Sequence, residues 1–138
     1  LSIYVMIHLG CGGIILRKGK VLLIRRVNTK TFNHLWSNPG GSVEEGESLE
    51  EACVRELKEE IDVEAMIVRK LGTYEDYQGG RLLGKNKLFG KYTGFLVDIG
   101  QSNPKINEPD KIAEIKYWHL NRLPTNIAPY TLQYLRNL

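Results

Sequence analysis

The sequence predicts an α+β fold, an αβα sandwich in which a central mixed β-sheet carries helices on both faces. Strand-like runs dominate the chain, and only two segments show a helical pattern, residues 49–61 and 129–137, which lie far apart in sequence. The chain has 138 residues, of which 42% are hydrophobic and 25% charged, as is typical of one globular unit with a real core. We therefore expect a single domain over residues 1–138.

The first half of the chain is predicted to begin with β-structure and to end with a helix. Strand-like apolar runs occupy residues 3–9, 11–17 and 21–26. Residues 28–47 contain Pro39 and several glycines, so we expect a loop there, with one short strand around Ser42–Glu44. Ser48 is a good N-cap for the first helix, and Glu51, three residues later, completes a capping box.

The second half is predicted to contain three further strands and the second helix. The strands are expected at residues 63–77, 87–99 and 114–120. The glycine-rich run QGGRLLGKN separates the first two, and a polar loop at 101–112 precedes the third. Pro124 and Pro129 frame the entry to the second helix.

Composition narrows the class of partner. The net charge of +3, on scattered basic residues, permits an anionic small ligand but does not predict a nucleic-acid polymer. No run approaches the roughly 18 apolar residues that span a membrane, and the apolar first 16 residues, which lack a basic n-region, are interpreted as strand rather than signal peptide. Cys11 and Cys53 lack a second ligand at metal spacing, so we interpret them as buried free thiols of a cytoplasmic protein.

The run RELKEE at residues 55–60 places three glutamates within six positions. On a helical wheel Glu56 and Glu60 share the apolar face, and Glu59 lies near its edge. A carboxylate near a core is costly unless it is paired or binds a metal, and we do not expect Arg55 alone to neutralise three acids. Carboxylates at this spacing suit a hard divalent cation, Mg²⁺ or Mn²⁺. The alternative is an ordinary solvated helix whose charge pattern is fortuitous.

The loop before the helix strengthens the metal interpretation. It contains Pro39, Gly40 and Gly41 in succession, and adjacent glycines let the backbone approach a ligand closely. A backbone carbonyl in this loop could supply a further oxygen ligand. The alternative interpretation is a simple tight turn.

Taken together, these residues resemble the Nudix box, whose pattern is G-x5-E-x7-R-E-U-x-E-E-x-G-U with U aliphatic. Gly41, Glu47 and the run from Arg55 to Val63 match eight of the nine specified positions. The exception is Asp62, which stands where the family has glycine. That position commonly adopts the left-handed conformation after a helix, and aspartate tolerates it better than most residues. We therefore expect the exception to affect the end of the helix more than the chemistry.

The resemblance implies metal-dependent hydrolysis of a nucleoside diphosphate linked to another moiety, in which water attacks phosphorus. It also implies that Mg²⁺, or Mn²⁺, binds the carboxylates and a backbone carbonyl. Carried over by position, the metal ligands are Glu56, Glu59, Glu60 and the carbonyl of Gly40. Arg55 resembles the arginine that orients the adjacent glutamates, and Glu47 resembles the glutamate that braces the box.

Other roles are less firmly assigned by the resemblance. Glu108, in the segment NEPDK, is our candidate for a further ligand or general base, with Glu114 as the competitor and a solvated loop residue as the alternative. Arg26 is favoured over Arg25 for contacting substrate phosphates, because adjacent residues of a strand face opposite ways. Gly41 and Asn38 complete the candidate substrate-binding set.

The small size resembles Nudix enzymes that act on nucleoside triphosphates or modified dNTPs, and the proline typical of ADP-ribose hydrolases is absent. An ADP-ribose or other nucleotide-derivative pyrophosphatase, and a silent nucleotide sensor, remain alternatives. An isoprenoid diphosphate isomerase is disfavoured because neither cysteine lies in a loop expected to reach substrate. Three aromatic residues could stack on a base but are interpreted mainly as core: Phe32, Trp36 and Tyr130. We expect a small-molecule nucleotide as partner, no membrane, and allow for a homodimer.

Overall fold

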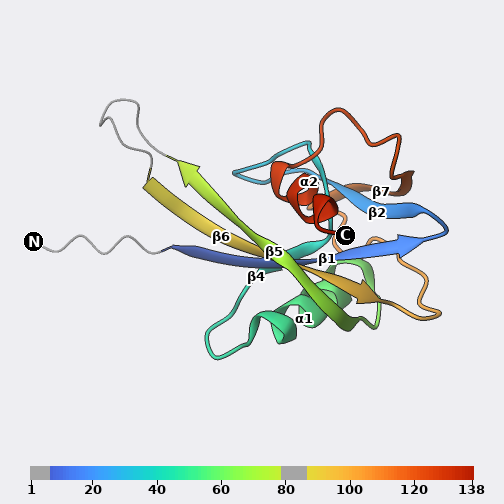
Figure 1. Cartoon of the computed structure of the whole chain (residues 1–138), viewed down its shortest axis with the longest axis horizontal. Helices are drawn as coiled ribbons and strands as arrows, with labels where there is room; N and C mark the ends of the chain where they lie inside the picture. The colour runs from blue at the N-terminus through green and yellow to red at the C-terminus, as the bar shows by residue number, and fades with distance from the viewer. Residues whose placement is uncertain (1–6, 79–86) are drawn as a thin grey trace, which may run out of the picture.

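Two helices lie on opposite sides of one β-sheet in the computed structural model, which describes residues 7–78 and 87–138 (Figure 1). In chain order the elements are β1 (His8–Arg17), β2 (Lys20–Arg26), β3 (Trp36–Ser37), β4 (Gly40–Ser42), α1 (Leu49–Ile61), β5 (Met66–Gln78), β6 (Lys87–Asp98), β7 (Ile112–His119) and α2 (Pro129–Arg136). The predicted αβα sandwich is therefore confirmed.

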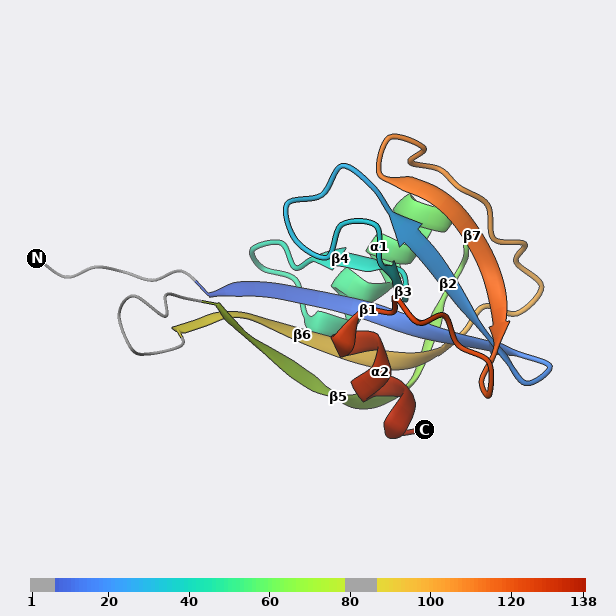
Figure 2. The ribbon, with the colours of Figure 1, turned by 90° about the horizontal axis from the view of Figure 1, so that it is seen from above.

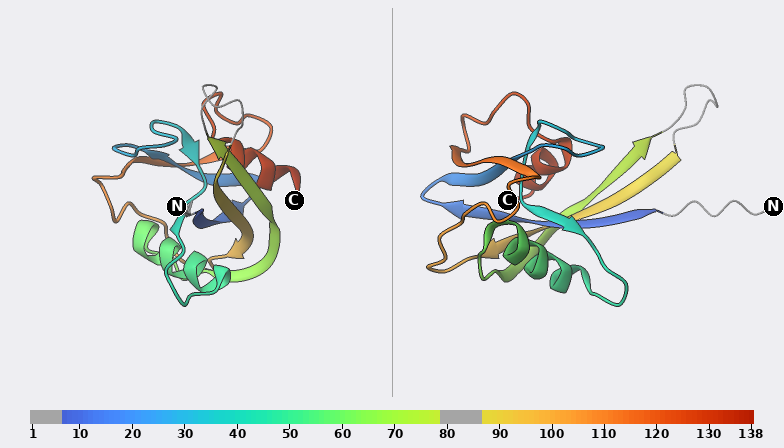
Figure 3. Two further views of the ribbon diagram at one scale, coloured as in Figure 1. Left: turned by 90° about the vertical axis from the view of Figure 1, so that its left-hand side faces the viewer. Right: turned by 180° about the vertical axis from the view of Figure 1, so that it is seen from behind.

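The sheet is mixed, as predicted. Its main path runs β3-β2-β1-β6-β5, with β4 paired to β1 and β7 paired to β2. β1 and β6 are parallel, from His8 opposite Gly90 to Ile15 opposite Val97, whereas β1 pairs antiparallel with β2 and with β4. Viewed from the end, the sheet lies between α1 and α2 (Figure 3). Since β4 leads towards α1, Gly40 and Gly41 of β4 are held beside the glutamate-bearing helix.

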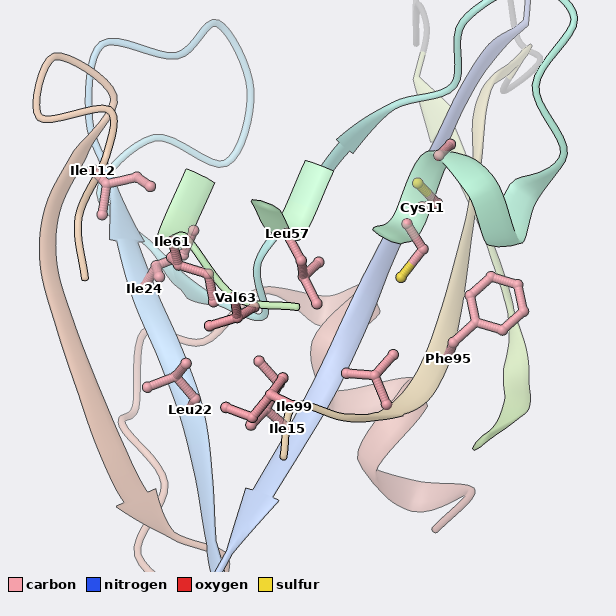
Figure 4. Packing of buried hydrophobic residues seen from close by; sticks show 13 residues of the cluster. Cys11, Ile15, Leu22, Ile24, Leu57, Ile61, Val63, Phe95, Ile99 and Ile112 are labelled. Atoms are coloured by element: carbon pink, nitrogen blue, oxygen red, sulfur yellow. The ribbon is translucent and has the colours of Figure 1, made fainter. Parts of the chain in front are cut away.

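Alternation along the central strands buries both faces of the sheet. Ile15 and Leu22 pack against α1, whereas their neighbours Ile14 and Val21 belong to a second cluster that includes Tyr134 of α2. Figure 4 shows the first cluster, in which side chains of α1, β1, β2 and β6 meet. Figure 2 shows α2 on the near side of the sheet and α1 on the far side. Because both faces of the sheet are buried, the sequences of these strands are continuous apolar runs.

Helix α1 begins as predicted. The Ser48 hydroxyl accepts a hydrogen bond from the Glu51 amide at 3.0 Å, and the Glu51 carboxylate accepts one from the Ser48 amide at 3.0 Å. Each bond satisfies an amide that has no partner within the helix. Ala52 and Leu57 are fully buried on the side facing the sheet, as the wheel predicts.

The end of α1 explains why Asp62 can replace the family glycine. Asp62 adopts the left-handed conformation (φ 56°, ψ 48°), and its amide donates to the carbonyl of Lys58 at 3.1 Å. Its carboxylate pairs with Lys58 at 2.8 Å and with Lys105 at 3.4 Å, so side-chain contacts offset part of the backbone cost.

We expect Asp62→Gly to leave the protein nearly unchanged. Glycine relieves the left-handed conformation but loses the two lysine contacts, and the two effects oppose each other. The melting temperature should move by no more than about 3 °C, and activity should remain within about twofold of the original. Differential scanning calorimetry and steady-state kinetics would check this. A large gain in activity would instead show that Asp62 slows the hydrolysis.

Several predicted boundaries were wrong. The two strands expected before residue 17 form one strand, β1, which starts at His8, and residues 1–6 lie outside the described part. β3 was missed, and the short strand expected at Ser42–Glu44 lies earlier, at Gly40–Ser42. Most of the glycine-rich run QGGRLLGKN also lies outside the described residues. No helix within the described ranges is long and apolar enough to cross a membrane.

Candidate active site

Arg55 organises the acidic end of the site. Its Nε donates to Glu47 Oε2 at 2.7 Å and its Nη2 to Glu47 Oε1 at 2.9 Å. Its Nη1 lies 3.0 Å from Glu56 Oε1 and 3.1 Å from Glu59 Oε2, and its Nη2 also donates to the carbonyl of Ser42 at 2.9 Å. Arg55 therefore joins the loop after β4 to one face of α1, and hydrogen bonds from its guanidinium lower the pKa of Glu47.

Glu60 is neutralised by a different arginine. Its side chain is 3% exposed, and Arg26 Nη1 donates to Glu60 Oε2 at 2.8 Å while Nη2 lies 3.4 Å from Oε1. The same Nη2 donates to the carbonyl of Gly40 at 2.8 Å, and the amide of Gly40 donates to Glu60 Oε1 at 2.7 Å. Burial alone would lower the pKa of Arg26, but its interactions with Glu60 and Tyr130 raise it above its ordinary value. This guanidinium is therefore a permanent cation in contact with Glu60.

Arg25 faces away from this pair. Its Nε lies 3.3 Å from Glu114 Oε2 across β2 and β7, where both side chains are partly exposed. The alternation that favoured Arg26 over Arg25 is therefore present in the structure. Glu114, the competitor of Glu108, is engaged by Arg25 on that other side.

The carboxylate of Glu56 lies against the backbone of Gly41. A Cβ added to Gly41 would stand 2.3 Å from Glu56 Cδ and 2.3 Å from Oε2. Burial first, and then the charge of Glu60, raise the pKa of Glu56 above its ordinary value of 4.5, although Arg55 opposes the shift. Gly41 therefore makes room for a glutamate, and its contact with substrate stays a prediction.

Because of that raised pKa, we expect Glu56→Gln to stabilise the metal-free protein at neutral pH. Between the ordinary value and the raised one the folded state binds more protons than the unfolded state, so stability falls as pH rises through this window. The variant should unfold at a higher temperature than the original at pH 8 in chelator. This gap between the two unfolding temperatures should narrow towards pH 4.5. The exposed Glu50→Gln change is the matched control. A gap that widens on acidification would contradict the assignment.

The three box glutamates are not gathered into one cluster. Among the described residues no group of three acidic, histidine or cysteine side chains is placed to hold an ion, since the carboxylates are divided between Arg55 and Arg26. Glu59 is about half exposed and the other two are largely buried. The oxygens nevertheless suit a hard divalent cation: Glu56 and Glu60 share a buried region, Gly41 leaves room for one of them, and the carbonyl of Gly40 lies beside the other.

Glu108 lies on a loop that packs against the end of α1. The amide of the preceding residue, Asn107, donates to the carbonyl of Glu60 at 3.0 Å, and the amide of Val27 donates to the carbonyl of Lys111 at 2.8 Å. The Glu108 side chain is 29% exposed and lies 3.7 Å from Lys111 Nζ. The loop thus joins the ends of α1 and β2, and the role of Glu108 stays a prediction.

A cavity of about 390 Å³ is lined both by this polar region and by aromatic rings. Arg26, Gly40 and Gly41 contribute to its lining. Aromatic side chains also line it: Phe32, Phe89, Tyr92, Tyr130 and Tyr134. The Phe32 and Tyr130 rings lie 5.2 Å apart, edge to face, and the Tyr92 and Tyr130 rings 5.7 Å apart. None of the described lining residues is acidic, so the cavity suits an anionic ligand with a flat apolar end.

The structure separates the three aromatic residues that were candidates for stacking. Phe32 and Tyr130 line the cavity, whereas Trp36 is 7% exposed and packs against Trp118. Phe32 has a φ of 54°, a conformation rare for a bulky residue and one that tends to mark functional positions. Sequence reasoning missed Tyr92, whose glycine-flanked position in KYTG on an inner strand could have indicated an accessible ring.

Asn38 lines the cavity, but its side-chain amide is hydrogen-bonded within the protein. Its Oδ1 accepts a hydrogen bond from the Thr131 hydroxyl at 2.6 Å, and its Nδ2 donates to the carbonyl of Pro39 at 3.0 Å. Its side chain therefore ties the Pro39 loop to α2. We interpret Asn38 as a residue that shapes the cavity wall.

Both cysteines are buried free thiols, as predicted. Cys11, however, lines the cavity from β1, which the sequence did not indicate. Burial, and next the charge of Glu56, raise the pKa of its thiol to about 12. Cys11 is therefore a neutral thiol at physiological pH, which argues against a nucleophilic role.

Comparison with protein families matches almost the whole chain to one family. The family described as NUDIX domain matches residues 6–138. An ADP-ribose pyrophosphatase of Methanocaldococcus jannaschii is 35% identical over 115 residues, which are 81% of this chain and 62% of that protein. A putative 8-oxo-dGTP diphosphatase of Bacillus subtilis is 34% identical, over 80% of this chain and 64% of that protein. The chain thus spans somewhat less than two thirds of these two relatives.

Solved structures agree on the fold. A MutT NUDIX hydrolase from Burkholderia pseudomallei superposes with a TM-score of 0.82 at 26% identity, covering 96% of this chain and 98% of that one. The near-complete coverage shows that the strands and helices described above follow the arrangement of that protein throughout.

Proposed function

The chain belongs to the Nudix hydrolase family, and from this premise we propose that it is a single Nudix domain that hydrolyses a phosphoanhydride bond of a nucleotide. Water attacks one phosphorus, the bridging P–O bond breaks, and two phosphate-bearing products leave. The observation that carries the proposal is the lining of the cavity, which combines Arg26 and Gly40, both hydrogen-bonded to Glu60, with aromatic rings. Such a cavity can hold the phosphates and the base of one nucleotide together.

The Nudix family generally uses divalent metal ions, and we propose Mg²⁺, with Mn²⁺ as a substitute. Glu56, Glu59, Glu60 and the carbonyl of Gly40 would hold it. When bound, such an ion neutralises phosphate charge and lowers the pKa of water. The protein's own part is to orient the ligands, and Arg55 does this for Glu56 and Glu59 through bonds of 3.0 and 3.1 Å.

The remaining residues act on substrate and water. We assign Arg26 to the substrate phosphates, since it lines the cavity and carries a planar fork of donors. Glu108 is our candidate to accept the proton of the attacking water or to bind the ion, from the loop that packs on the end of α1. Gly41 and Asn38 would line the cavity beside the phosphates.

The substrate we favour is a nucleoside triphosphate or modified dNTP. The aromatic rings that line the cavity suit one stacked base, and the volume suits a single nucleotide unit more than a dinucleotide. The B. subtilis relative, described as a putative 8-oxo-dGTP diphosphatase, supports this choice. ADP-ribose is the second candidate, because the M. jannaschii relative is described as an ADP-ribose pyrophosphatase. We expect a cytoplasmic protein with no polymer partner, and a homodimer would be compatible with the proposal.

Phosphate and pyrophosphate release from a nucleotide panel tests the proposal. The panel holds dNTPs, 8-oxo-dGTP, CTP, ADP-ribose and dinucleoside polyphosphates, each with Mg²⁺, with Mn²⁺ and with chelator. We expect metal-dependent turnover of a triphosphate at least tenfold faster than of ADP-ribose. Preference for ADP-ribose would select the second candidate. Nucleotide binding without any turnover would favour a sensor.

A further inference from the structure

We infer that Arg26 is a positioning residue whose side chain has two alternative positions, here called stations. At the first station it holds the predicted metal ligands together while no ion is bound. At the second station, to which it moves when the ion binds, it contacts a substrate phosphate. The inference deepens the proposed function and rests on it. It makes Arg26 the residue that couples ion binding to nucleotide binding.

The first station is visible in the structure. The Arg26 guanidinium donates to both oxygens of Glu60 and to the carbonyl of Gly40, at 2.8, 3.4 and 2.8 Å. These are the oxygens assigned to the ion. A guanidinium and a divalent cation are both positive, so they repel each other and compete for the oxygens beside which both would lie. An ion bound at these oxygens therefore favours withdrawal of Arg26.

The first station is needed because Glu60 is buried. Its side chain is 3% exposed, and a buried carboxylate without a cation is strongly unfavourable. Its carboxylate accepts hydrogen bonds from Arg26 and from the Gly40 amide, and Arg26 is the cation of the two. The arginine thus keeps the site folded before the ion arrives.

The second station is the cavity itself. Arg26 is one of its lining residues and interacts with Tyr130, another lining residue. None of the described lining residues is acidic, so a withdrawn guanidinium would lack an anion there. A nucleotide phosphate supplies that anion and accepts the two-pronged donor geometry of arginine. Ion and phosphate therefore favour each other's binding, and this coupling is reciprocal.

The neighbouring arginine provides a matched control. Arg25 is adjacent in β2, is also paired with a glutamate, and faces away from Glu60. Replacing either arginine with glutamine removes one positive charge and one ion pair from the same strand. Only Arg26→Gln removes the competitor for the ion.

The test measures binding of Mn²⁺ alone, without nucleotide, by electron paramagnetic resonance and by calorimetry. Arg26→Gln should bind Mn²⁺ about fivefold or more tightly than the unaltered protein, at the lower end of typical coupling between sites. Arg25→Gln should bind as the unaltered protein does. Arg26→Lys, which keeps a charge without the fork, should be intermediate. Equal or weaker Mn²⁺ binding by Arg26→Gln would overturn the inference.

A second measurement uses the unaltered protein, so it does not depend on the stability of any variant. The Nε–Hε resonance of Arg26, assigned with Arg26→Lys, should move on addition of Mg²⁺ and move again when inorganic phosphate follows. The Arg25 resonance should stay in place. An Arg26 resonance that does not move on addition of Mg²⁺ would overturn the first station, and one that does not move on addition of phosphate would overturn the second.

Failure of the unaltered protein to bind Mn²⁺ would overturn the proposed metal-dependent hydrolysis as well. Normal Mn²⁺ binding without movement of the Arg26 resonance would overturn only this inference.

Discussion

Glu60→Gln is expected to reduce kcat by about 10³-fold or more while also destabilising the metal-free protein. The amide lacks the charge that a divalent cation needs. It also cannot present two acceptors, although Glu60 now accepts from Arg26 on both oxygens and from the Gly40 amide at 2.7 Å. In either orientation the glutamine NH2 would face a donor, Arg26 or the Gly40 amide, and the buried arginine loses its anion.

The loss of stability should be substantial because the pair is buried. Arg26 is 15% exposed and Glu60 is 3% exposed at the side chain, so solvent does little to compensate the charge that remains. Breaking such a pair from one side costs about 3 kcal/mol. Urea unfolding in chelator measures this loss of stability, and kcat/KM with saturating Mg²⁺ measures the loss of activity. Glu50→Gln, on the exposed face of the same helix, should change neither. Retention of more than a tenth of the activity by Glu60→Gln would remove Glu60 from the ion site.

The sequence predicted most of the fold because the relevant signals are local. The Ser48–Glu51 capping box, the apolar face of α1 and the apolar runs of β1 and β2 each depend on residues close in sequence. β3 escaped prediction because two residues, Trp36 and Ser37, carry no periodicity. Its existence depends on pairing with β2, which only the folded chain provides.

The sequence named candidate residues for the site but did not indicate how they pair. The motif named Glu56, Glu59 and Glu60, yet nothing in it indicates that Glu60 pairs with an arginine 34 residues earlier. That contact requires β2 to end beside α1. The aromatic lining of the cavity was harder still to predict, since Tyr92 and Tyr130 meet only through the packing of α2 on β6. Side-chain partners far apart in sequence follow from topology, which local patterns do not specify.

The two adjacent glycines of β4 should respond in different ways to the same substitution. In Gly40→Ala the new Cβ would lie 2.1 Å from the carbonyl oxygen of Cys11 and 2.5 Å from Gly12 Cα, and Gly40 has a φ of 159°. Both neighbours are backbone atoms of a central strand and cannot move aside. We expect a loss of about 3–5 kcal/mol in the free energy of unfolding, and little soluble protein.

In Gly41→Ala the new Cβ meets a movable group instead, the carboxylate of Glu56 at 2.3 Å. The far end of a glutamate can swing away, so the fold should survive with a loss of about 1 kcal/mol or less. The carboxylate, however, leaves the place that Arg55 and Gly41 give it, and a displacement of this kind costs about 10²-fold in rate. Circular dichroism and urea unfolding would establish that the variant is folded, and kcat would then report the displacement. A folded Gly41→Ala variant with full activity would show that hydrolysis does not depend on the present position of Glu56, whereas a folded and inactive one would show that glycine is required at this position to seat a ligand.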